Sequence, residues 1–130
     1  MARVLMIGID PDEVDFSDPA LPPGLTPEII RKGVAIGVDA VRAAGLEVEQ
    51  AYISARPDAA VALLQAKLAA APFQCVVIGG GVHLPPRNRP LFEALLNAIG
   101  RHSPTPAIAL ISRPEESAEA TARVLGRAPA

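Results

Sequence analysis

The sequence predicts an α/β fold, a three-layer doubly wound parallel sheet of four strands. Apolar segments of strand length alternate four times with helical segments that open on prolines. The apolar run 75–78 stops at three glycines, as expected of a strand buried on both faces and followed by a tight loop. Because right-handed crossovers leave few windings, we expect strand order 2-1-3-4, a flavodoxin-like layout lacking the fifth strand.

The composition limits the domain organisation and the partners. The 130 residues fit one domain, 1–130, which can bury enough surface to fold alone. No apolar run approaches the roughly 20 residues that span a bilayer. A net charge of −2 and 3% aromatic residues give neither a basic stripe nor stacking aromatics. We therefore expect a cytoplasmic protein with no membrane or nucleic-acid partner.

The cysteine and histidines give no spacing for a structural zinc site, and no residues identify a cofactor. Cys75 lies in the apolar run, so a buried, unreactive thiol is expected. His102 follows a helical segment and is expected at the surface. We therefore expect no metal.

The first strand is expected at 3–9, and it ends where Pro11 removes a backbone donor. Residues 11–25 are rich in prolines and acidic residues, and loops of this length are usually functional or mobile. Phe16 and Leu21 are expected to anchor this loop. Whether it is a lid or a static loop stays open.

A helix is expected from the capping Thr26 to about Ala44. Within it, Gly33 and Gly37 lie one turn apart and indicate that another segment approaches closely. We favour packing against the sheet over a helix-to-helix dimer contact.

The later elements follow the same signals. An edge strand is expected at 46–54, because two glutamates point out of one face, and a helix follows from Pro57. Asn88 is expected to cap the next helix, which ends at Gly100. The remaining expected elements are a strand at 106–112 and a helix at 113–126.

A ligand site is expected where the winding reverses, beyond the carboxyl ends of strands 3–9 and 75–78. Two loops would form this crevice: residues 11–25, the acidic loop, and residues 79–81, the glycine loop. The expected ligand-binding residues are Asp10, Asp15, Ser17, Asp18, Gly79, Gly80, Gly81, His83, Arg87 and Ser112.

Histidine is the side chain that titrates near neutral pH, and His83 is the histidine expected at the crevice. The candidate catalytic residues are therefore His83, Asp10 and Asp12. A general base oriented by one of the aspartates is one interpretation, and we favour a histidine that simply caps the glycine turn. The acidic loop is expected to dock on Arg87 or Arg89, for about 0 to 1 kcal/mol per exposed ion pair.

Phosphate and nucleotide motifs are incomplete. The glycines follow the third strand instead of the first, which argues against a dinucleotide fingerprint, and no lysine and hydroxyl follow them as in a phosphate-binding loop. The segment 10–14 resembles the first motif of haloacid dehalogenase-type phosphatases, but Lys67 falls in a helix and no later acidic pair follows. The layout also resembles receiver domains, which need an aspartate where this chain has Gly79.

The runs 7–11, 14–19, 22–24 and 76–81 resemble a group of small bacterial α/β proteins of flavodoxin-like or Rossmann-like type. The resemblance covers most of the chain and implies a bacterial cytoplasmic domain. It carries no activity or catalytic residues, and it suggests only that Asp15, Ser17 and Asp18 belong beside Asp10 and His83 in the site.

The leading hypothesis is a small-molecule-binding domain, and whether it is also an enzyme stays open. Glycine amides and arginines would favour an anionic group, although the nearby acids oppose a highly charged one. The alternative is a non-catalytic protein-interaction module that uses an exposed sheet edge or the 11–25 loop. A homodimer could cover the edge of strand 106–112.

Overall fold

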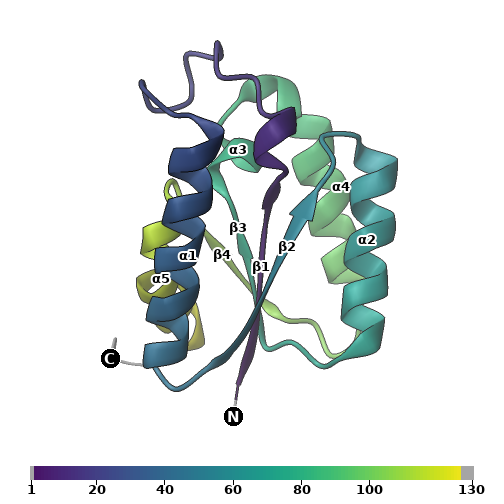
Figure 1. Ribbon diagram of the computed structural model, residues 1–130. Helices are drawn as coiled ribbons and strands as arrows, with labels where there is room; N and C mark the ends of the chain where they lie inside the picture. Colours follow the sequence, from purple (N-terminus) through teal and green to yellow (C-terminus); the bar gives the residue numbers. More distant parts are fainter. Residues whose placement is uncertain (1, 127–130) are drawn as a thin grey trace.

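The fold is a four-stranded parallel sheet with helices on both faces (Figure 1). A computed structural model describes residues 2–126. The strand order is β2-β1-β3-β4, as predicted. The strands are β1 (Arg3–Ile9), β2 (Glu47–Ile53), β3 (Cys75–Ile78) and β4 (Ala107–Leu110).

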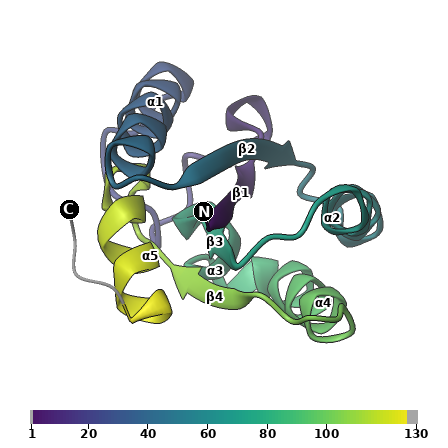
Figure 2. The same ribbon diagram turned by 90° about the horizontal axis from the view of Figure 1, so that it is seen from below.

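Two helices cover each face of the sheet (Figure 2). One face carries α1 (Pro27–Ala43) and α5 (Ser117–Leu125), and the other carries α2 (Pro57–Ala70) and α4 (Arg89–Gly100). This is the predicted three-layer, flavodoxin-like arrangement. Short turns complete it: the one-turn helix α3 (Gly80–His83) and the 3-10 turns η1 (Pro11–Glu13), η2 (Pro86–Asn88) and η3 (Pro114–Glu116).

The strand β3 is the centre of the structure. All of its residues are buried, and it pairs in parallel with both β1 and β4. Alternate residues enter two cores: Val76 faces α2 and α4, and Val77 faces α1 and α5. The prediction that strands 3–9 and 75–78 are parallel neighbours is therefore confirmed.

One local prediction is wrong, and another is confirmed only in part. Residues 80–83 were expected in a loop, and they form α3. Asn88 occupies the N-cap position of α4, as expected, but its side chain makes no capping hydrogen bond. Instead, Nδ2 of Asn88 donates to the carbonyl oxygen of Gly81 in α3 at 2.8 Å.

The close approach at Gly33 and Gly37 comes from η3, whereas the sheet had been the favoured interpretation. A Cβ on Gly37 would overlap the carbonyl oxygen of Pro114, and one on Gly33 would stand 2.7 Å from Oε1 of Glu115. The Met6 side chain, from the sheet, is more distant, at 3.4 Å from the Gly37 position. The two glycines therefore let η3 pack against α1. Within residues 2–126, no helix is both long enough and apolar enough to cross a bilayer.

Candidate functional site

A cavity of about 230 Å³ lies between α1 and the carboxyl end of the sheet. Its floor is formed by Met6, Gly8 and Val77 from the two central strands. Met6 and Val77 belong to the core that packs against α1, which places the cavity on this face. The cavity therefore lies at the edge of the sheet where a ligand site was expected.

The position of Gly8 explains why the space is empty. Residues alternate between the two faces of a strand, so Gly8 faces α1 as Met6 does. A Cβ built on Gly8 would have no atom within 4 Å. None of the residues in 2–126 fills the place that a side chain would occupy here. A glycine inside a strand often marks a place where another group approaches closely.

The roof of the cavity is apolar. Ile30 and Val34 contribute from α1, and Leu21 and Leu25 contribute from the loop that precedes it. Leu21 was expected to anchor the loop, and it is partly buried in this position. The acidic loop, residues 11–25, therefore forms part of the cavity wall.

One end of the cavity is formed by β2 and reaches solvent. Tyr52 is the register partner of Gly8, so it flanks the empty position. Tyr52 is 36% exposed and Ile29, across from it on α1, is 50% exposed, so this end is open. Partial burial raises the pKa of Tyr52, Arg31 opposes the rise and Asp10 adds to it. The hydroxyl is therefore protonated at neutral pH and can donate a hydrogen bond.

The other end is formed by residues 111–115, which several contacts hold in place. Glu116 accepts hydrogen bonds from the backbone N–H groups of Ser112, at 2.8 Å, and Arg113, at 2.9 Å. These donors hold the pKa of Glu116 below its ordinary value. A Cβ on Gly80 would stand 2.6 Å from the carbonyl oxygen of Ser112, so only glycine lets this segment pack so closely on α3.

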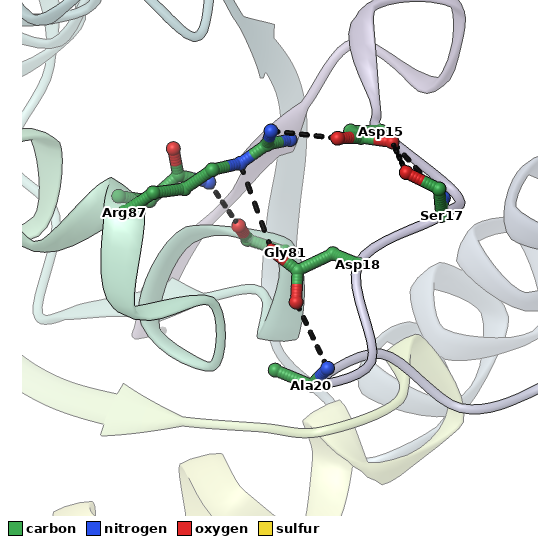
Figure 3. A network of polar contacts seen from close by, with 7 residues as sticks. Asp15, Ser17, Asp18, Ala20, Gly81 and Arg87 are labelled. Atoms are coloured by element: carbon green, nitrogen blue, oxygen red, sulfur yellow. Dashed lines mark hydrogen bonds and ion pairs between the residues drawn. The ribbon is translucent and has the colours of Figure 1, made fainter.

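The predicted docking of the acidic loop is found in the structure, through Arg87 (Figure 3). Nη1 of Arg87 lies 2.6 Å from Oδ2 of Asp15, and its Nε lies 3.6 Å from Oδ2 of Asp18. The pKa of Asp15 is lowered, first by hydrogen bonds from the hydroxyl and N–H of Ser17 and then by Arg87. Arg89 makes no ion pair with any residue in 2–126.

The ten predicted ligand-binding residues fall into three groups. Gly80, Gly81 and Ser112 line the cavity. Asp15, Ser17, Asp18 and Arg87 form the docking contact, which lies outside the cavity lining. The third group, Asp10, Gly79 and His83, makes hydrogen bonds to the backbone outside the cavity lining: Oδ1 of Asp10 accepts from the Asp12 N–H at 2.9 Å, the Gly79 N–H donates to Ile7, and His83 bonds to Ile111.

Among the three candidate catalytic residues, Asp10 accepts a hydrogen bond from the Asp12 backbone, and His83 makes no hydrogen bond to either aspartate. Nε2 of His83 donates to the carbonyl oxygen of Ile111 at 2.7 Å, because a carbonyl can only accept. Asp12 pairs with Arg31 at 2.8 Å. His83 therefore holds residues 111–115, which form one end of the cavity, instead of facing an aspartate across a crevice.

The sequence reasoning missed the apolar lining. Ile30, Val34 and Tyr52 line the cavity, and none of them was among the predicted site residues. Gly8 was the available signal, since a glycine interrupts an otherwise apolar strand there.

Comparison of the chain with protein-family models, curated proteins and solved structures found no match. Among residues 2–126, no group of three or more His, Cys, Asp or Glu side chains could hold a metal ion.

Proposed function

We propose that this protein binds a small molecule in the cavity between α1 and the sheet. The observation that carries the proposal is the vacant position at Gly8, where a side chain would fit without meeting any other atom. Ligand pockets in open α/β sheets occur at this edge, and they are mostly apolar with a few polar groups at their margin. The lining of this cavity has that composition.

Binding alone is proposed, without a catalytic step. Asp10, Asp12 and His83 are each engaged by other groups and do not line the cavity.

The test uses a variant that fills the cavity. Wild type and Gly8→Val are screened against one fragment library by ligand-observed NMR, with Gly100→Ala as the matched control. Gly100 lies at the end of α4, and a Cβ there also meets nothing within 4 Å. We expect fragments that bind wild type and Gly100→Ala and fail to bind Gly8→Val. Fragments that bind all three proteins equally would contradict the proposal.

A second candidate function is self-association through the edge of β4. Leu110 on this strand is 41% exposed, and β4 pairs only with β3 among the described strands. The occupant would be a second copy of the chain, which could extend the sheet. A monomer in size-exclusion chromatography with light scattering at micromolar concentration would contradict this candidate.

A further inference from the structure

We infer that the ligand of the cavity is an uncharged, largely apolar molecule of one or two rings. This inference rests on the proposed function and specifies the class of molecule. It departs from the sequence-based expectation of an anionic group.

The charges around the cavity argue against an anionic ligand. Arg113 and Glu115 are the only charged residues among the described lining residues, and their charges cancel. Arg87, which was expected to attract an anion, is engaged by Asp15 and Asp18 outside the cavity. A phosphate group in this cavity would therefore lose its hydration without gaining a compensating cluster of cations.

The walls favour apolar contact. Met6 and Val77 below and Ile30 and Val34 above offer hydrocarbon to a ligand between them. Water in such a space would find few hydrogen-bonding partners, so its displacement by an apolar group is favourable.

The size of the cavity and its aromatic neighbour indicate a ring. An apolar cavity of about 150 Å³ takes up benzene, so the volume of about 230 Å³ found here accommodates one or two rings. Tyr52 flanks the vacant position at Gly8 and can pack against such a ring.

Polar groups occur at the two ends of the cavity. Tyr52 and Gln50 are at the open end, and Ser112 is at the other. The Tyr52 hydroxyl is a donor at neutral pH, because even the ordinary pKa of tyrosine, 10.0, lies well above 7, and burial raises it further. One neutral hydrogen-bonding group at the edge of the ring system fits this arrangement.

The test compares three probes by ¹H–¹⁵N NMR titration of wild type, Gly8→Val and Gly100→Ala. The probes are indole, which is neutral, indole-3-propionate, which is a monoanion, and adenosine 5′-monophosphate, which carries a ring system with a phosphate. We expect indole to bind most tightly and to shift the amide signals of Gly8, Val34 and Tyr52. The Kd of indole should rise about tenfold or more in Gly8→Val, because overlap of the ligand with the valine side chain that costs about 1.4 kcal/mol raises Kd tenfold. The Kd should stay unchanged in Gly100→Ala.

The outcomes separate this inference from the proposed function. If a charged probe binds more tightly than indole and its binding is lost in Gly8→Val, the ligand class is wrong and the cavity remains the site. If indole binds wild type and Gly8→Val equally, the cavity is not the binding site, and both the ligand class and the proposed function are wrong. If no probe and no library fragment binds wild type, both are also overturned.

Discussion

Gly37 in α1 lies directly against the carbonyl group of Pro114, so closely that no side chain fits between them. This contact joins the first helix of the chain to the segment after its last strand. It holds residues 111–115 at the end of the cavity, where His83 and Glu116 also bind this segment. The width of the cavity therefore depends on packing between distant parts of the chain.

Gly37→Ala is expected to destabilise the protein by about 2 kcal/mol or more, because overlap with a backbone group forces α1 and η3 apart. Urea unfolding followed by circular dichroism measures this change. The matched control is Gly33→Ala, which meets only the flexible end of the Glu115 side chain. It should be neutral or stabilising, by up to about 1 kcal/mol, because alanine favours the helix. Equal effects of the two substitutions would contradict the assigned contact.

Gly8→Ala is expected to stabilise the protein by about 0.5–1 kcal/mol. The new methyl group enters empty space, and the unfolded chain loses the extra freedom of glycine. Urea unfolding checks the value. A loss of stability would mean that the position beside Tyr52 is not vacant.

Thr121→Val is expected to stabilise the protein by about 1 kcal/mol. The buried Oγ1 of Thr121 has no oxygen or nitrogen hydrogen-bonding partner among the described residues, and the thiol of Cys75 on which it acts is only a weak acceptor, so replacing Oγ1 by a methyl group removes a desolvation cost. Ser117→Ala on the same helix is the contrasting variant. The Ser117 hydroxyl donates to the Pro114 carbonyl at 2.6 Å, so this change should destabilise by about 1 kcal/mol. Urea unfolding measures both changes in stability. If Thr121→Val destabilises the protein, Oγ1 of Thr121 forms a stabilising hydrogen bond in the folded state and the prediction is wrong.

Arg87→Ala is expected to make the acidic loop, residues 11–25, more accessible to protease, because Arg87 binds this loop through Asp15 and Asp18. Limited proteolysis at pH 7 should cut the loop severalfold faster than in wild type. Arg89→Ala is the control, because Arg89 forms no ion pair with any residue in 2–126. Equal cleavage of wild type and Arg87→Ala would show that the ion pairs do not hold the loop.

The ion pair between Arg87 and Asp15 also makes the stability of the protein depend on pH. The folded pKa of Asp15 lies below the unfolded value of 3.8, so its stabilising contribution is complete above pH 3.8. The contribution is lost as the pH falls through the folded pKa. The difference in Tm between wild type and Arg87→Ala should therefore be constant from pH 7 to about pH 5 and shrink below pH 3.8. Thermal unfolding at several pH values tests this, and a difference that grows on acidification would contradict it.

The thiol of Cys75 is expected to react very slowly in the folded protein. It is buried, and burial raises its pKa to about 11, with a smaller opposing effect of the Thr121 hydroxyl. Little reactive thiolate is therefore present at pH 8. Reaction with a chromogenic disulfide reagent should be fast only in denaturant. Rapid labelling without denaturant would show that β3 opens readily.

The sequence by itself determined the strands, the main helices and the strand order. These follow from local signals, such as the β-branched run at 75–78 and the capping Thr26, combined with the right-handed crossover. It also gave the edge of the sheet at which a cavity lies, and the docking of the acidic loop on Arg87, because opposite charges there leave the sheet at the same edge.

Only the tertiary structure decided which residues face the cavity. The acidic residues and His83 have the chemistry of a site, yet Asp15 meets Arg87 and His83 meets the Ile111 carbonyl. These pairings join segments far apart in the chain, and no local pattern specifies them. The space at Gly8 exists because none of the described residues packed around this strand fills it, and such packing is a property of the assembled layers.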